Sequence, residues 1–377
     1  MKIAIVHDWL QTWAGAEHVL QEMVSLYPSA EVFTLVDFLS AEDRARLGNC
    51  TIRTSFLQRL PRARTSFRRY LPLFPKAIES LDVSSADLII SNSHAVAKGI
   101  TKRPGQLHVC YCYTPMRYAW DLRDQYLAQV GLDRGLRGWV AGRMLERIRR
   151  WDQRTSAGVD DFIAISRYIA ERIERAYSCT AQVIYPPVTQ AASPPPQARH
   201  GYVTVSRLVP YKRIDLIAAA FRAMPDRELT IVGEGPERAR IEAAAGPNVK
   251  LLGYLPDQER NAVVAGAQAF IFTADEDFGL APLEAQSLGT PVIGLGRGGT
   301  LETIPGLDSE VPTGVLFTEQ SAAAIVEAVA RFEAHAGRIT PEACRANAAL
   351  FSHARFRDEF VAAVNEQYAR FRRSAAG

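Results

Sequence analysis

Residues 269–285 read AFIFTADEDFGLAPLEA and join a short apolar strand, an acidic loop and the start of a helix. The strand is predicted over residues 269–273. Gly279 is predicted to open the helix, because Pro282 is tolerated only in a first helical turn. A strand that leads directly into a helix is typical of a parallel sheet covered by helices on both faces.

The same alternation of strands and helices extends over the chain and is broken once, by a proline-rich connector over residues 185–200. With 377 residues the chain is too long for one ordinary core, so two domains are expected. We therefore predict an α/β protein of two doubly wound halves, followed by an amphipathic helix over residues 356–373. The predicted strands are 2–7, 31–35, 88–91, 108–113, 161–165 and 182–184 in the first half, and 202–206, 228–232, 249–252, 269–273, 291–294 and 314–317 in the second.

Composition points to a globular protein of the cytoplasm. Hydrophobic residues make up 47% and charged residues 23%. The apolar start of the chain is interrupted at once by His7-Asp8, which predicts a first strand rather than a signal peptide. The five cysteines are scattered and odd in number, which argues against a disulfide framework.

Two glutamates bracket the helix start that Gly279 opens. A helix N-terminus attracts phosphate through its free N–H groups, whereas a carboxylate accepts hydrogen bonds from hydroxyls. By position, Glu284 suits a ribose and Glu276 suits a hexose. The alternative is that Glu276 caps the helix and Glu284 is an ordinary surface charge.

Two cations follow the strand at 202–206. Arg207 leaves its carboxyl end and Lys212 precedes the next helix, so both could neutralise a diphosphate in a cleft. Surface salt bridging is the alternative.

The loop at 233–237 resembles a dinucleotide-binding turn, but Arg238 replaces its third glycine. Gly15 and Gly233 could each allow close approach to a ligand or serve as plain turn residues.

Polar residues also follow strands in the first half. Asp8 follows the first strand, and His94 lies immediately after the strand at 88–91. Ligands of open parallel sheets bind beyond the carboxyl ends of the strands. Both residues are therefore candidates for a site, although an exposed or capping role is equally open.

The net charge of +3 is unevenly distributed. The first basic segment, residues 53–76, holds seven basic residues and no acid, with large apolar residues in between. The second, residues 134–150, holds Arg134, Arg137, Arg143, Arg147, Arg149 and Arg150 against Asp133 and Glu146. Such segments suit an anionic membrane surface or, alternatively, a solvated helix face above a core. Nucleic acid is not expected as a partner, because no binding motif accompanies the charge.

These motifs together resemble family 4 retaining glycosyltransferases over nearly the full chain. The resemblance rests on Arg207 with Lys212, on the segments 232–236, 248–253 and 289–293, and on Glu276 with Glu284, all in the family's order. Segments 14–17, 93–99, 114–121 and 184–188 are similar to a bacterial subgroup of mannosyltransferases of surface polysaccharide synthesis.

The resemblance implies a GT-B fold, in which two Rossmann-like domains face each other across a cleft. The implied boundaries are 1–187 for the acceptor domain, 188–355 for the nucleotide-sugar domain, and 356–377 for a helix that crosses back. It implies retention of configuration, no metal and no cofactor. The donor is a nucleotide-diphosphate sugar, for which the subgroup suggests GDP-mannose, and the acceptor is a lipid-linked saccharide or glycan. Such an enzyme would work in the cytoplasm or peripherally on the inner face of the plasma membrane.

The resemblance also assigns residues, by position. Arg207, Lys212, Glu276 and His94 are the predicted catalytic residues. On the acceptor side we expect Asp8, His94, Tyr113 and Arg117, although Tyr113 stands where many relatives carry histidine. Ile165 likewise replaces a frequent asparagine. The predicted donor-binding residues are Gly15, Arg207, Lys212, Gly233, Gly253, Glu276, Phe278, Gly279, Leu280 and Glu284.

Three alternatives remain. The first is an epimerase or another non-transferring enzyme on the GT-B fold, which the paired glutamates disfavour. A NAD-binding oxidoreductase would need a full glycine fingerprint after the first strand, and Gly15 alone does not supply it. A non-catalytic binding protein is disfavoured by the intact charged residues.

Overall fold

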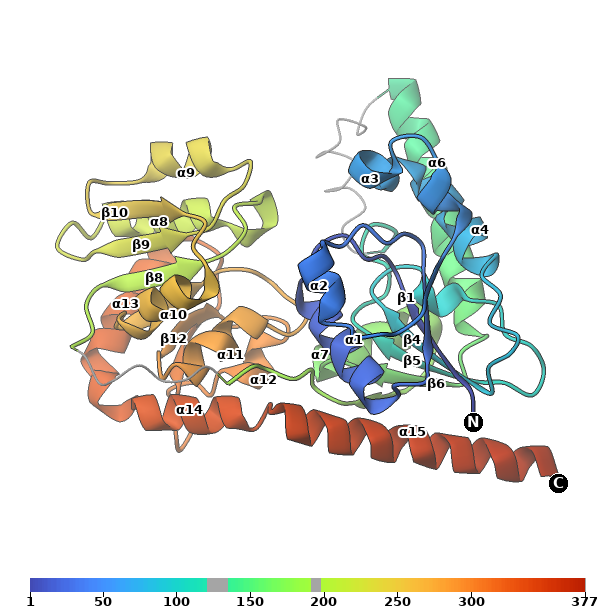
Figure 1. The fold of residues 1–377 in the computed structure, drawn as a ribbon. Helices are drawn as coiled ribbons and strands as arrows, with labels where there is room; N and C mark the ends of the chain where they lie inside the picture. Colours follow the sequence, from blue (N-terminus) through green and yellow to red (C-terminus); the bar gives the residue numbers. More distant parts are fainter. Residues whose placement is uncertain (121–134, 191–197, 377) are drawn as a thin grey trace. The chain divides into compact units, whose positions relative to one another are not determined.

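The computed structural model describes residues 1–120, 135–190 and 198–376 (Figure 1). The chain divides into two compact units. Unit 1 comprises Met1–Pro186 and Phe356–Gly377, and unit 2 comprises Pro187–Arg355. Asp121, Asp133, Arg134 and the prolines at 194–196, all named in the sequence analysis, lie outside the described residues.

Unit 1 is built on a parallel sheet with the strand order β3-β2-β1-β4-β5-β6-β7. Strands β1, β4 and β5 are buried along their whole length, which explains why their sequences are rich in apolar residues rather than alternating. The strands are β1 (Ile3–His7), β2 (Glu31–Thr34), β3 (Ile52–Thr54), β4 (Leu88–Ser93), β5 (Leu107–Cys112), β6 (Asp161–Ala164) and β7 (Ala181–Val183).

Helices connect these strands and cover the sheet (Figure 1). The long helix α6 is anchored by a buried ion pair, in which Lys98 Nζ lies 2.8 Å from Asp152 Oδ1. Asp152 Oδ2 also accepts hydrogen bonds from Trp120 and Tyr177, so the carboxylate ties α6 to neighbouring parts of the core. The helices are α1 (Gly15–Leu26), α2 (Ala41–Ala45), α3 (Ala63–Ser66), α4 (Phe74–Glu79), α6 (Gly135–Ser156) and α7 (Arg167–Tyr177), with 3-10 turns η1 (Phe56–Arg59), η2 (Phe67–Leu73) and η3 (Ala97–Gly99).

Unit 2 repeats this plan with the strand order β10-β9-β8-β11-β12-β13, again in parallel. The order runs outward from β8 in one direction and from β11 in the other, so the connections diverge between these two strands. Ligands of doubly wound sheets bind at such a switch point, beyond the carboxyl ends of the strands. The strands are β8 (Tyr202–Val205), β9 (Leu229–Val232), β10 (Val249–Gly253), β11 (Ala269–Phe272), β12 (Val292–Leu295) and β13 (Gly314–Phe317).

The helices of unit 2 lie on both faces of this sheet (Figure 1). The core on one face contains Phe221, Ile231, Ile271 and Val329, all of which are almost fully buried. The helices are α8 (Ile214–Arg222), α9 (Arg238–Ala244), α10 (Asp257–Ala265), α11 (Leu280–Ser287), α12 (Thr300–Thr303), α13 (Ala322–His335) and α14 (Pro341–Ala349), with 3-10 turns η4 (Pro210–Lys212) and η5 (Ala336–Arg338).

The last helix, α15 (His353–Ala376), belongs to unit 1 from Phe356 onward. Phe356 and Phe360 are fully buried and pack edge-on against Tyr111 of β5, with ring centroids 5.7 and 6.0 Å apart. Arg357 pairs with Glu22 of α1. The C-terminal segment is therefore an integral part of the first core.

Each strand predicted from the sequence is present, with ends shifted by at most two residues. Strand β3 was not predicted, because it has only three residues, includes Arg53 and lies at the edge of the sheet. Within the described ranges, no helix combines the length and apolar character that a membrane span requires.

Candidate functional site

The loops that follow the strands of unit 2 contain most of the predicted site residues. All carboxyl ends of a parallel sheet lie at one edge. The loops after β8 and β9 contribute Arg207, Lys212 and Gly233, and the loop after β11 contributes Glu276 and the start of α11. Their positions depend on how these loops pack against each other.

The loops after β8 and β9 touch backbone to backbone. Gly233 has a φ of +133°, and a Cβ built on it would lie 1.9 Å from the carbonyl oxygen of Ser206. A Cβ on Gly235 would lie 2.3 Å from the carbonyl oxygen of Leu208. Leu208 N–H donates to the Glu234 carbonyl at 2.9 Å, which closes the contact. The two glycines are thus required for loop packing.

Gly253 at the end of β10 extends this packing. Its carbonyl accepts a hydrogen bond of 2.7 Å from Gly233 N–H, and its φ of +74° favours glycine. The predicted roles of Gly233 and Gly253 at a ligand stay predictions, but both residues already shape the loops that carry Arg207 and Lys212.

The loops after β11 and β12 make a second close contact. Gly299 N–H donates to the Glu276 carbonyl at 2.9 Å. A Cβ on Gly298 would lie 2.4 Å from that same carbonyl oxygen, and one on Gly299 would lie 2.3 Å from Phe278 Cα. The backbone from Glu276 to Phe278 is therefore held in place by glycines far away in the sequence.

Lys212 and Glu276 form an ion pair across these loops, between Nζ and Oε1. Both side chains are mostly buried, with 14% and 20% of their surfaces exposed. The ammonium also lies 5.6 Å from the centre of the Phe272 ring, and Thr273 Oγ1 donates to the Lys212 carbonyl at 2.7 Å. The structure brings together two of the predicted catalytic residues.

Helix α11 begins beside this pair without a side-chain cap. Gly279 is its N-cap in a left-handed conformation, with φ +90°, so Glu276 does not cap the helix. The first-turn N–H groups have no acceptor within the helix and are suited to bind an anion. The Phe278 side chain is buried and packs on Phe351 at 5.7 Å, so only its backbone could serve a ligand.

Arg207 and Glu284 lie in the same part of unit 2 but do not touch the ion pair. Arg207 is exposed and makes no ion pair with any described residue. Glu284 is exposed on α11 beside a hollow lined by Val205, Arg260, Asn261 and Ala281. Desolvation by the surrounding atoms nevertheless raises the pKa of the Glu284 carboxyl, an effect that Arg260 opposes.

In unit 1, Asp8 has the capping role that the sequence left open as the alternative to a place in a site. Its buried carboxylate accepts four backbone hydrogen bonds, from the N–H groups of His94, Ala95, Val96 and Ala97 at 2.5–3.0 Å. Each carboxylate oxygen is used twice. Asp8 therefore holds the loop between β4 and η3 and is poorly placed to act as a base.

His94 lies on this loop, with Nδ1 3.1 Å from Asp8 Oδ2 but without hydrogen-bond geometry. Its side chain is 24% exposed, yet desolvation of the ring lowers its pKa, an effect that the Asp8 carboxylate opposes. Burial thus favours the neutral form of the imidazole. The Tyr113 ring lies 6.3 Å from it, and burial raises the pKa of the Tyr113 phenol well above its usual value.

Sequence reasoning missed the polar residues beneath these candidates. His7 Nε2 lies 3.4 Å from Glu17 Oε1, and Asn92 Nδ2 lies 3.1 Å from His7 Nδ1. Glu17 also accepts from Ala14 N–H at 3.0 Å, which fixes the start of α1 at Gly15. The positions of His7, Glu17 and Asn92 in the sequence give no sign of this network, although Asn92 belongs to a polar run at the end of its strand. Arg117, the remaining predicted acceptor-side residue, is half-buried.

Known proteins are similar to this chain in its second half by sequence. Residues 189–351 match the family model described as "Glycosyl transferases group 1". A GDP-mannose-dependent monoacylated alpha-(1-6)-phosphatidylinositol monomannoside mannosyltransferase of Corynebacterium glutamicum is 37% identical over 114 residues, which is 26% of this chain and 30% of the relative. The chain spans less than a third of the length of the curated relatives that it matches.

Solved structures match over the whole chain. Anabaena HepE in complex with UDP has a TM-score of 0.68 at 18% identity, covering 97% of this chain and all of that one (100%). A sucrose-phosphate synthase from Thermosynechococcus elongatus has a TM-score of 0.69 at 20% identity, covering 98% of this chain and 100% of that one. The fold is GT-B. The fold class predicted from the sequence is confirmed, with one Rossmann-like sheet in each unit.

The role of Asp8 can be tested by Asp8→Asn. The new amide would place an NH₂ donor against backbone N–H donors, so we expect a loss of about 1–3 kcal/mol in the free energy of unfolding. Asp82→Asn is the control, because Asp82 is 77% exposed and accepts from only one backbone N–H, that of Ser84. Urea unfolding of both variants checks this, and equal stabilities would contradict the assignment.

The loop contact in unit 2 can be tested by Gly233→Ala. We expect a larger loss of stability than the roughly 1–2 kcal/mol that a left-handed residue alone costs, because the methyl group would overlap the Ser206 carbonyl. Gly279→Ala is the matched control in the same unit, with φ +90° but no atom nearer than 3.5 Å. If urea unfolding showed the same loss of stability for Gly233→Ala and Gly279→Ala, the contact with the Ser206 carbonyl would not be what requires glycine at position 233.

Proposed function

We propose that the chain is a glycosyltransferase that moves a hexose from a nucleotide-diphosphate donor to an acceptor, with the donor bound at the carboxyl edge of the second sheet. The observation that carries the proposal is the Lys212–Glu276 pair beside the uncapped start of α11. A cation, free N–H groups and a carboxylate suit a phosphate joined to a sugar. All lie within the segment that matches the glycosyltransferase family model.

Each residue has a definite task in this proposal. Lys212 and Arg207 would neutralise the diphosphate, with the backbone N–H groups of 278–280 donating to its oxygens. Glu276 would accept hydrogen bonds from hydroxyls of the donor hexose, and Glu284 would accept them from the ribose. The exposure of Glu284 on α11 beside the hollow leaves its carboxylate accessible to a ligand.

The reaction would proceed with retention. The bond between the anomeric carbon and the diphosphate oxygen breaks, and the acceptor oxygen forms its bond on the same face. The acceptor's proton passes to the departing phosphate oxygen. Lys212 and Arg207 would stabilise the negative charge that develops on this leaving group, and no metal is invoked for that task.

For the substrates, we propose GDP-mannose as donor and a lipid-linked saccharide as acceptor, in the synthesis of a bacterial surface polysaccharide. The name of the Corynebacterium relative supports mannose and GDP, whereas the Anabaena structure contains UDP. With such an acceptor the enzyme would work from the cytoplasm, at the inner face of the plasma membrane. We propose His94, Tyr113 and Arg117 for the acceptor side.

The donor can be identified by thermal shift with GDP, UDP, ADP and TDP. We expect GDP to raise the melting temperature most, because a ligand at 100 times its Kd adds about 2.7 kcal/mol of stability. Lys212→Ala should lose the shift, whereas Lys250→Ala, an exposed lysine paired with Glu228, should keep it. If another nucleotide gave the largest shift, that nucleotide would replace GDP in the proposal. If none of the four gave a shift, the proposed donor site would be rejected.

Transfer itself is tested at two of the proposed site residues, Lys212 and Glu284. We expect Lys212→Ala and Glu284→Ala to abolish sugar transfer while keeping the wild-type unfolding midpoint, and Lys250→Ala to remain active. Product analysis by mass spectrometry with and without acceptor separates a transferase from an epimerase, which would alter the donor sugar without any acceptor. Wild-type rates in either variant would remove the donor-site assignment.

A further inference from the structure

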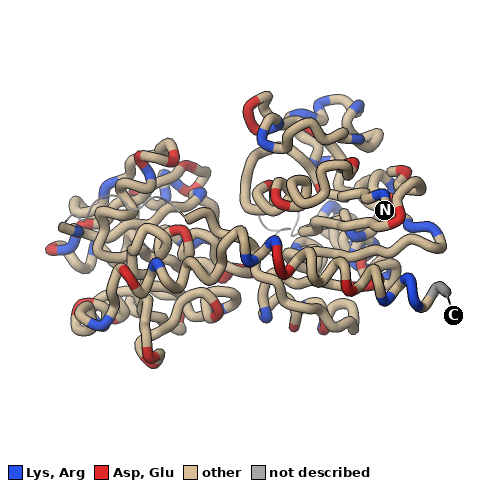
Figure 2. The backbone as a smooth tube through the Cα atoms, turned by 60° about the horizontal axis from the view of Figure 1, so that its bottom comes forward, with Lys and Arg blue, Asp and Glu red and all other residues tan. Residues whose placement is uncertain are grey.

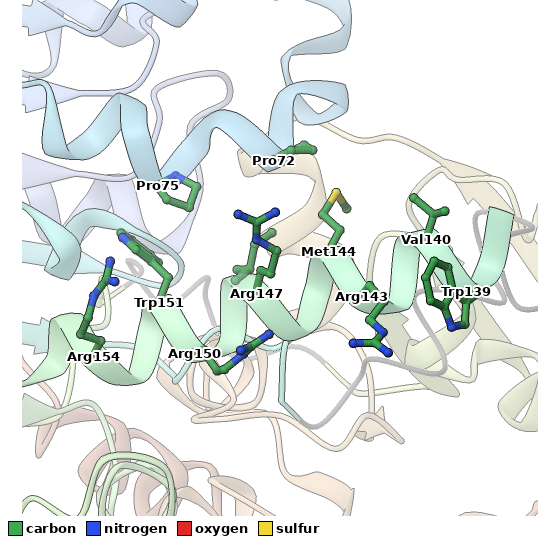
Figure 3. A pocket seen from close by; sticks show the side chains of 11 residues that line it. Pro72, Pro75, Trp139, Val140, Arg143, Met144, Arg147, Arg150, Trp151 and Arg154 are labelled. Carbon is green, nitrogen blue, oxygen red and sulfur yellow. The ribbon is translucent and has the colours of Figure 1, made fainter. Parts of the chain in front are cut away.

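The two basic segments predicted from the sequence lie together in unit 1. Pro72 and Pro75, from η2 and α4, line one groove with the exposed face of α6 (Figure 3). Figure 2 shows that basic and acidic positions are spread over both units, so the net charge of +3 does not describe this surface. The first segment contributes these two prolines to the groove, and the second contributes its arginines.

The charge on this groove is not neutralised by the described protein. Arg143, Arg147 and Arg150 are exposed, and none of them makes an ion pair with a described residue. They follow each other at three- and four-residue spacing along α6, and so they line one side of the helix. Only Arg154, farther along, approaches an acid, at 3.9 Å from Glu79.

Large apolar side chains are exposed beside these arginines. Leu136, Trp139 and Val140 at the start of α6 are 78%, 60% and 55% exposed, and Leu73 of η2 is 39% exposed. Apart from Met1, the exposed large apolar residues in the described part of unit 1 all belong to the two basic segments. Arg143 stacks on the Trp139 ring at 5.2 Å, which joins charge and apolar surface directly.

The opposite face of α6 is already committed to the core. Ala141 and Leu145 are buried, whereas Ile148 and Trp151 lie at the edge of this face and also line the groove. Asp152 is held by Lys98. The face with Arg143, Arg147, Arg150 and Trp139 therefore lies on a helix whose other side is packed into the core.

We propose that this face docks on an anionic phospholipid membrane. Arginines would meet lipid phosphates, and Trp139, Val140 and Leu136 would enter the boundary between headgroups and acyl chains, where tryptophan is favoured. The exposed aliphatic residues distinguish this face of α6 from a nucleic-acid-binding surface, because such a surface binds mainly through its charge. The binding requires no glycosyl transfer, although it would bring the proposed active site to a lipid-linked acceptor.

Vesicle sedimentation tests the charge. The protein should bind vesicles of phosphatidylcholine with phosphatidylglycerol and not phosphatidylcholine alone. Arg143→Gln, Arg147→Gln and Arg150→Gln together should weaken binding on the order of a hundredfold, since each basic residue contributes about fivefold. The control replaces the equally exposed Arg222, Arg331 and Arg338 of unit 2 by Gln, with the same change in net charge, and should bind as wild type.

A second variant tests the apolar part. Trp139→Ser should weaken vesicle binding and make the binding that remains more sensitive to salt. Val311→Ser, at a 58% exposed residue of unit 2, should leave vesicle binding unchanged. Binding to neutral vesicles alone, equal loss in both arginine triples, or arginine-dependent binding of nucleic acid without vesicle binding would each overturn the proposal. Transfer to a water-soluble acceptor should be unchanged in the α6 variants, which separates this proposal from the proposed function.

Discussion

The close approach of loop backbones at the carboxyl edge of the second sheet is the constraint on which the candidate site depends. Gly233 lies where any Cβ would overlap the Ser206 carbonyl, and Gly299 lies against Phe278 Cα. Both contacts require residues without side chains. These contacts hold the loop that carries Lys212 against the loop after β9, and the loop that carries Glu276 against the loop after β12. Lys212 and Glu276, 64 positions apart in sequence, meet between the two held loops in one ion pair beside the start of α11. The glycines therefore support the loops that carry the charged residues.

Unit 1 fixes its loops with buried carboxylates instead of glycines. Asp8 accepts four backbone N–H groups ahead of η3, and Glu17 accepts the N–H of Ala14 while it contacts His7. A buried carboxylate is costly unless charge-assisted hydrogen bonds satisfy it, and here they do. As a result, buried carboxylates hold both the loop that carries His94 and the start of α1 at Gly15. The two units share a strand order but secure the loops at the same edge of the sheet in different ways.

The sequence was most informative where burial is continuous. Strands such as β4 and β11 are buried on both faces, so their apolar runs alone locate them, whereas β3 at the sheet edge has no such run. Charged and polar residues at strand ends could be chosen as site candidates because a parallel sheet has one carboxyl edge. Their partners could not be found, since the pairing of Lys212 with Glu276 depends on the packing of loops that are distant in sequence. Asp8 lies at the predicted strand end, but its carboxylate holds a loop rather than lying open to a ligand, because four backbone N–H groups already donate to its oxygens.

A glutamate close to a phosphate site would at first seem unfavourable, and the ion pair explains how it is tolerated. In the free protein Lys212 already neutralises Glu276, so the pair brings no net negative charge to the start of α11. An ammonium has three donors. In the proposed complex, one donor can stay on Glu276 while the others turn to the diphosphate, and the exposed Arg207 supplies the additional charge. In that proposal the second oxygen of the carboxylate would accept from a sugar hydroxyl, so phosphate recognition and sugar recognition would lie on either side of a single lysine.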